Sequence, residues 1–98
     1  MTITKEQTGS ALTVAVEGRL DTTTAPDLEA ELKSSLDGVS ELTVDLGKLD
    51  YISSAGLRVL LWAHKTMSKQ GSMKVTNVQE VVNEVFEVTG FADILTIE

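Results

Sequence analysis

The first part of the chain has the apolar and polar pattern of two short strands. Residues 11–17 alternate apolar and polar side chains, as expected of a strand that buries one face. Residues 2–7 form a shorter segment before it, and the turn-forming pair Gly9 and Ser10 separates the two. This pattern predicts that the chain opens with a β-hairpin.

A period of three and four residues then replaces the period of two, which indicates an amphipathic helix. Thr24 can cap this helix, Pro26 suits its first turn, and Asp27 stands at the capping-box position three residues after Thr24. The recurring apolar positions are Ala25, Leu28, Leu32 and Leu36. We expect the helix to start at Thr24 or Ala25 and to end at the Asp-Gly pair of residues 37–38.

Strands and helices continue to alternate along the rest of the chain. A strand is predicted over residues 42–46, stopped by Gly47, and a helix over residues 55–69, ending near Gly71. The last expected elements are a strand over 73–76, a helix over 78–88 and a strand over 94–97. This order predicts an α/β fold: one mixed sheet of about five strands that opens with a hairpin, with its three helices packed mainly on one face.

Composition limits the chain to one small domain. The 98 residues are 42% apolar and 23% charged, which suits a single domain over residues 1–98 and excludes a multidomain enzyme. The longest apolar run, residues 59–63, is far shorter than the roughly 18 residues of a membrane span, and the start of the chain has no signal-peptide pattern. We therefore expect a cytoplasmic protein without a membrane partner.

Charge and rare residues exclude several kinds of chemistry. Eight basic against 15 acidic residues give a net charge of -7, which disfavours nucleic acid as a partner. There is no cysteine for a disulfide, a thiolate zinc site or a thiol nucleophile. The single histidine, His64, cannot build a metal site alone, so we expect no metal and no cofactor.

Two adjacent serines mark the start of the helix over residues 55–69. Composition and spacing favour a simple role, in which Ser53 or Ser54 caps the helix. A hydroxyl there also lies beside free backbone N–H groups and the positive end of the helix dipole, where a phosphate is best accommodated. A serine hydrolase is excluded, because Ile52 stands where the nucleophile elbow needs glycine, and His64 should lie about 15 Å along the helix from Ser54. We do not expect an enzyme.

The same helix carries a stripe of cations around a tryptophan. Arg58, Trp62, Lys65 and Lys69 follow spacings of four, three and four. If the opposite side faces the sheet, Trp62 projects outward among cations, which is typical of an interface with an acidic partner. The alternative is that Trp62 lies partly against the neighbouring helix and that the cations form an ordinary solvated face.

Several segments together resemble a known family. They are the Gly-Arg-Leu-Asp run of residues 18–21 before a Thr-Ala helix start, the Val-Asp-Leu run of residues 44–46, and the run Leu-Asp-Tyr-Ile-Ser-Ser-Ala-Gly-Leu of residues 49–57. These segments are similar to those of the bacterial anti-sigma factor antagonists of the STAS domain family. The resemblance covers essentially the whole chain and implies one STAS domain over residues 1–98.

The resemblance implies a partner-switching function. In that family an anti-sigma factor, itself a serine kinase of the histidine-kinase-like ATPase class, phosphorylates a serine of the antagonist. The unmodified antagonist binds the anti-sigma factor and frees a sigma factor. The family motif places the acceptor at Ser54, with Ser53 as the alternative. Two departures are Ser53, where many members have Asp, and Ala55, which replaces a second hydroxyl residue.

The resemblance also implies a surface for the partner. Its expected residues are Asp21, Thr22, Thr23, Ser53, Ser54, Gly56, Leu57, Arg58 and Trp62. Asp21 matches the family's acid and is expected near the serine loop, although a turn or capping role explains an Asp at this position equally well. A serine phosphatase that reverses the modification is a further partner to consider, and we expect a monomer or a weak dimer.

Two other functions stay open at this point. A STAS scaffold or transport-regulating subunit would bind its partner without being phosphorylated, and the two motif departures favour it. A small enzyme or nucleotide-binding regulatory module would use a pocket at the sheet edge, but the chain offers one histidine and scattered carboxylates.

Overall fold

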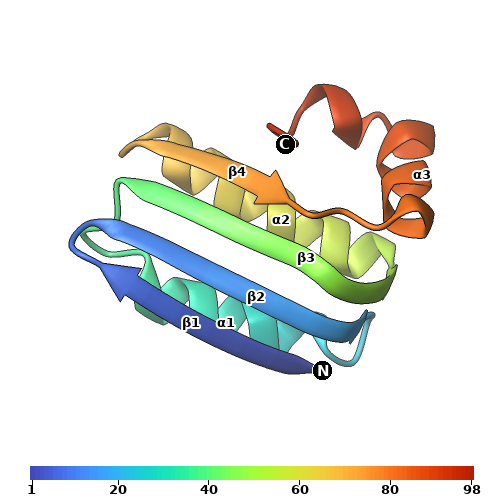
Figure 1. Ribbon diagram of the computed structural model, residues 1–98, viewed down its shortest axis with the longest axis horizontal. Helices are drawn as coiled ribbons and strands as arrows, with labels where there is room; N and C mark the ends of the chain where they lie inside the picture. Colours follow the sequence, from blue (N-terminus) through green and yellow to red (C-terminus); the bar gives the residue numbers. More distant parts are fainter.

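The computed structural model describes all 98 residues and shows a four-stranded sheet with helices on one side (Figure 1). The elements are β1 (Thr2–Thr8), β2 (Ala11–Leu20), α1 (Ala25–Ser35), β3 (Glu41–Ile52), α2 (Ser54–Ser68), β4 (Ser72–Thr76), α3 (Glu80–Thr89) and a short 3-10 helix, η1 (Phe91–Asp93). The strand order is β1-β2-β3-β4. The first pair is antiparallel and the other two are parallel, so the predicted hairpin and mixed sheet are confirmed.

The helices cover one face of the sheet. In Figure 1, α1 and α2 lie behind the strands, and α3 lies past one end of β4. Each helix buries the apolar positions that its period predicts; α1, for example, buries Ala25, Leu28 and Leu32. Alternate residues of β2 from Leu12 to Val16 are buried beneath the helices. The other face of the sheet carries no helix. None of the helices combines the length and apolar content needed to cross a membrane.

The predicted fifth strand is wrong, because the chain beyond α3 folds into η1 and then meets the edge of the sheet at a single bridge. The backbone N–H groups of Ile94 and Leu95 both donate to the carbonyl oxygen of Phe91, at 3.0 and 2.9 Å. Only a single bridge, between Val75 and Ile97, then joins this segment to β4. The sheet therefore has four strands rather than five.

The predicted stop of a strand at Gly47 is also wrong, since β3 continues to Ile52. The N–H of Gly47 donates to the side-chain oxygen Oδ1 of Asp45 at 2.9 Å, and the register with β2 shifts at this point. This β-bulge absorbs one extra residue without ending the strand. As a result, β3 runs the full length of β2 and ends beside Leu20.

Candidate functional site

The candidate site lies where β2 and β3 end side by side and where α1 and α2 begin. Leu20 and Ile52 are register partners at the two strand ends. One residue further on, the N–H of Ser53 donates to the carbonyl oxygen of Leu20 at 2.9 Å. The parallel strands thus bring the turn that starts at Asp21 next to the serine pair, as the resemblance implied.

The structure distinguishes the two serines. Ser53 has an extended backbone and is the N-cap of α2; its hydroxyl oxygen accepts a hydrogen bond from the Gly56 N–H at 3.5 Å. Ser54 is the first residue of the helix, is exposed, and its hydroxyl takes part in no hydrogen bond. Ser53 therefore has the capping role, and Ser54 offers a free hydroxyl at the positive end of the helix dipole.

Gly56 allows α2 to start this close to the strand ends. A Cβ atom at this position would lie 2.7 Å from Leu20 Cγ and 2.9 Å from Ile52 Cγ1. Gly56 is buried and the neighbouring Leu57 is only 5% exposed. Gly56 and Leu57 were both expected on the partner surface. Because both are buried, they support the start of α2 and are not available to a partner.

Asp21 closes the turn between β2 and α1. Its Oδ1 accepts hydrogen bonds from the Thr23 hydroxyl at 2.7 Å and from the N–H groups of Thr23 and Thr24 at 3.0 and 3.1 Å. The Thr23 hydroxyl is the main cause of a lowered pKa of Asp21; partial desolvation opposes it, and the two N–H groups add to the lowering. The turn role is confirmed. Its Oδ2 lies 3.9 Å from Arg19 Nε and forms a long ion pair at the surface.

Thr24 does not cap α1 with its side chain, contrary to the prediction from the sequence. Its hydroxyl instead donates to the Arg19 carbonyl oxygen at 2.8 Å and accepts from the Asp21 N–H at 2.8 Å. The backbone of Thr24 is already helical, so its side chain cannot reach back to the first helical N–H groups in the usual capping geometry. Thr24 therefore stabilises the Asp21 turn.

An exposed cation–π pair at the ends of β2 and β3 was not predicted from the sequence. Arg19 and Tyr51 are register partners on β2 and β3, and the Arg19 guanidinium carbon lies 4.2 Å from the centroid of the Tyr51 ring. This is cation–π geometry. Tyr51 is 40% exposed and stands near the end of β3, two residues before Ser53.

Trp62 lies in a groove between α1 and α2 and does not project freely outward. The groove has a volume of about 440 Å³ and is lined by Thr22, Ala25, Pro26, Glu29, Ala55, Arg58, Val59 and Trp62. Lys33 Nζ of α1 lies 5.6 Å from the centroid of the indole ring. Of the two alternatives for Trp62, packing against the neighbouring helix is confirmed. The groove also brings Thr22 and Arg58 to one surface.

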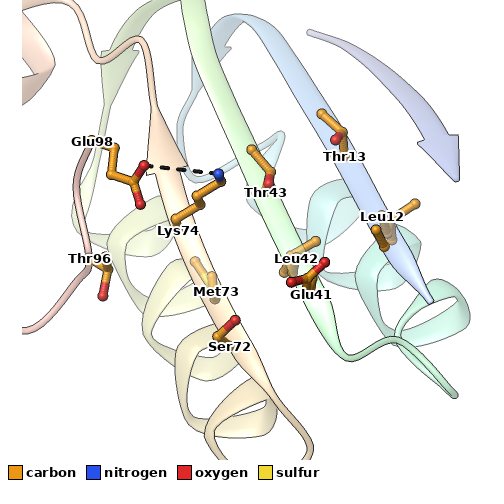
Figure 2. A pocket seen from close by; sticks show the side chains of 11 residues that line it. Leu12, Thr13, Glu41, Leu42, Thr43, Ser72, Met73, Lys74, Thr96 and Glu98 are labelled. Atoms are coloured by element: carbon orange, nitrogen blue, oxygen red, sulfur yellow. Dashed lines mark ion pairs between the residues drawn. The ribbon is translucent and has the colours of Figure 1, made fainter. Parts of the chain in front are cut away.

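Another hollow, of about 360 Å³, lies on the open face of the sheet (Figure 2). Its walls come from the first residues of β2, β3 and β4, which is the end of the sheet opposite to Ser54. The labelled Lys74 and Glu98 pair there at 3.9 Å. No group of three or more His, Cys, Asp or Glu side chains lies close enough to hold a metal ion, here or elsewhere in the chain.

Comparison with known proteins agrees with this architecture. The family profile described as "Mlab, STAS domain" matches residues 3–96. BtrV of Bordetella bronchiseptica is 38% identical over 99 residues, covering 99% of this chain and 85% of that protein. The anti-sigma-B factor antagonist of Bacillus subtilis is 31% identical over 93 residues, covering 94% of this chain and 85% of that protein.

Solved structures share the fold at low sequence identity. The anti-sigma factor antagonist SpoIIAA in its unphosphorylated form has a TM-score of 0.84 and 17% identity, covering 99% of this chain and 88% of that chain. The phosphorylated form of the Bacillus protein has a TM-score of 0.76 and 16% identity, covering 99% and 91%. Because both the family profile and the relatives span nearly the whole sequence, the chain belongs to the STAS domain family and, within it, to the anti-sigma factor antagonists.

Proposed function

We propose that the chain binds an anti-sigma factor that is a serine kinase of the histidine-kinase-like ATPase class, releases a sigma factor in the cytoplasm, and loses this binding when Ser54 is phosphorylated. The names of its relatives support the antagonist role. The fold neighbour SpoIIAA, solved in unphosphorylated and phosphorylated forms, supports a phosphorylation switch on this fold. A serine phosphatase would then restore the binding form.

One observation carries the choice of Ser54. Its hydroxyl is exposed and free, whereas the hydroxyl of the adjacent Ser53 is held by the Gly56 N–H. A phosphate on Ser54 would lie at the start of α2, which has no acidic residue in its first turn. The helix dipole and the free N–H groups favour an anion there, so the isolated domain tolerates the modification.

The same phosphate opposes docking. It adds about 1.5 to 2 negative charges, and an interface that closes over Ser54 must desolvate that charge or separate. A loss of about 3–4 kcal/mol would weaken the complex several hundredfold, because each 1.4 kcal/mol is about tenfold in affinity. No change in the backbone is needed for such a switch.

The groups around Ser54 form the proposed contact surface. The accessible groups are Asp21 and Thr22 in the turn after β2, Tyr51 near the end of β3, Arg58 in the second turn of α2, and the half-buried Trp62 about one turn further on. Aromatic and arginine side chains contribute most to protein interfaces. We assign Thr23 a supporting role, since its hydroxyl already binds Asp21.

Phosphorylation of the purified chain tests the assignment. The chain is incubated with ATP and its cognate histidine-kinase-like ATPase, and the modified residue is mapped by mass spectrometry. We expect one phosphate on Ser54, full loss of incorporation in Ser54→Ala, and retained incorporation in Ser53→Ala. Unchanged incorporation in Ser54→Ala would overturn the site.

A STAS subunit that binds its partner without modification is the second candidate. The motif departures favour it, because Ser53 stands where many members carry an acid and Ala55 removes a hydroxyl. In that case the kinase reaction gives no phosphate on either serine, and Ser54→Asp binds the partner as tightly as the unchanged chain.

A further inference from the structure

Charge is distributed unevenly along this acidic chain. Residues 51–79 contain none of the 15 acidic residues and four of the eight basic ones. Two of these four, Arg58 and Lys65, lie on α2, and a third, Lys69, is its C-cap residue. The helix that starts at Ser54 is therefore a cationic element in a protein with a net charge of -7.

The cations of α2 are exposed and have no ion-pair partner, unlike most other cations of the chain. The ion pairs join Lys5 to Glu31, Arg19 to Asp21, Lys33 to Glu29 and Lys74 to Glu98. Arg58, Lys65 and Lys69 are absent from these pairs. Free charges of one sign on one helix attract a partner surface of the opposite sign.

One of these cations, Arg58, borders a largely apolar groove, while Lys65 and Lys69 lie further along the helix. Ala25, Pro26 and Val59 line the groove between α1 and α2 together with the half-buried Trp62, and Arg58 stands on its rim. The two helices lie behind the sheet in Figure 1. Lys33 covers the indole ring from α1 but is held by Glu29 at 3.1 Å. An occupant of the groove thus meets apolar side chains, the Glu29 carboxylate that pairs with Lys33, and the free positive charge of Arg58.

We infer that the groove between α1 and α2 receives an acidic segment of the anti-sigma factor, whose apolar or aromatic side chain packs on Trp62 and whose carboxylates pair with Arg58 and Lys65. This inference rests on the proposed function. The groove is continuous with the Ser54 surface, because Ala55 and Arg58 line its near end. Nucleic acid would meet 15 carboxylates on the rest of the chain, and a second copy would repel through its own negative charge.

Trp62 and Ser54 contribute separately to binding. Trp62 comes eight residues after Ser54, about 12 Å along the helix axis. Effects at sites separated by more than about 7–10 Å are usually additive. Trp62 therefore supplies affinity in both states of the switch, whereas Arg58, four residues after Ser54, is close enough to couple to a phosphate there.

Trp62 is the only tryptophan of the chain, which gives the groove its own reporter. Fluorotryptophan incorporated into the chain gives a single fluorine NMR signal. Titration with the purified kinase of the phosphorylation experiment is expected to shift or broaden this signal. A signal that stays unchanged while the complex forms would overturn the groove assignment.

Charge reversals provide the second test. Arg58→Glu is expected to weaken the complex about tenfold or more, and Lys65→Glu several-fold. The affinity of both variants should also depend less on salt, between roughly 50 and 300 mM, than the affinity of the unchanged chain. Lys48→Glu is the matched control, because Lys48 is also exposed and unpaired but lines a hollow on the open face of the sheet. It should change the affinity by less than about twofold. Equal effects of Arg58→Glu and Lys48→Glu would contradict the inference.

Truncation of the indole completes the set. Trp62→Ala should weaken the complex about tenfold, and Trp62→Phe less, with amide NMR spectra confirming that both fold. If phosphorylation of Ser54 abolishes binding while the Arg58 and Trp62 variants bind normally, the groove is wrong and the proposed function stands. If the groove variants weaken binding while phosphorylation has no effect, the switch is wrong and the groove stands.

Discussion

Gly56 lies so close to Leu20 that a side chain at position 56 would overlap with it. A Cβ atom there would be 2.7 Å from Leu20 Cγ, and Leu20 is fully buried. The hydrogen bond from the Ser53 N–H to the Leu20 carbonyl oxygen lies at the same junction. The end of β2 therefore fixes the start of α2, and with it the direction in which Ser54 faces the solvent.

Gly56→Ala should destabilise the fold although alanine is the better helix former. Overpacking costs about 1–3 kcal/mol, against a gain in helix propensity of about 1 kcal/mol. We expect a net loss of up to about 2 kcal/mol, measured by urea unfolding. Ser54→Ala on the same turn is the control and should change stability by less than about 0.5 kcal/mol, because Ser54 is exposed. A stabilised Gly56→Ala would contradict the close contact.

The carboxylate of Asp21 should make stability depend on pH in the acidic range. The Thr23 hydroxyl and the turn N–H groups lower its pKa below the unfolded value of about 3.9. Its contribution is therefore present above pH 4 and is lost as the pH falls through the folded pKa. Asp21→Asn should lose this contribution, so its urea midpoint differs from that of the unchanged chain most at neutral pH.

Thr23→Val tests the assigned cause of this shift. Without the hydroxyl, the pKa of Asp21 should move back toward its ordinary value, which a carboxyl NMR titration measures directly. Thr22→Val, next to it, is the control, because the Thr22 side chain makes no hydrogen bond to Asp21. Equal pKa values in the two variants would remove Thr23 as the main cause.

Replacement of the two serines should separate capping from modification. Ser53→Ala removes the acceptor for the Gly56 N–H and should cost about 0.5–1 kcal/mol, since the bond is long at 3.5 Å. Ser53→Asp restores a capping acceptor and should keep the stability of the unchanged chain. Thermal unfolding of the unchanged chain, Ser53→Ala, Ser53→Asp and Ser54→Ala measures these differences in stability. A loss in Ser54→Ala but not in Ser53→Ala would reverse the two roles.

Phosphorylation should leave the backbone of the domain almost unchanged. Arg58 follows Ser54 by four residues, the spacing at which a phosphate and a guanidinium on one helix stabilise it by a few tenths of a kcal/mol. Amide NMR shifts should therefore be confined to the start of α2 and the Asp21 turn. Large shifts in β1 or β4 would show that the switch acts through a rearranged sheet.

The local periods of the sequence were sufficient to predict most of the fold. The apolar spacing in α1 and α2 reflects burial on one face, so the helices and their orientation could be predicted. Features that depend on exceptions to regular geometry could not. At the bulge beside Gly47, β3 does not stop but continues for several residues. After η1, only one bridge forms where a strand was expected.

The candidate site shows the same division. The family resemblance predicted that Asp21 lies near the loop of Ser54. From the sequence, either serine could have capped the helix, and only the backbone geometry assigns that role to Ser53. The stacking of Arg19 on Tyr51 depends on two register shifts between β2 and β3. Such shifts arise from bulges whose positions the alternation of residues does not reveal.

The affinity of the anti-sigma factor for the unmodified chain and for the chain fully phosphorylated on Ser54 tests the central claim most directly. Isothermal titration of both forms at one salt concentration, with Ser54→Ala as the unmodifiable reference, gives the three dissociation constants. The account predicts equal values for Ser54→Ala and the unmodified chain, and a value at least about a hundredfold weaker for the phosphorylated chain. Equal affinity of the phosphorylated and unmodified chains would contradict it.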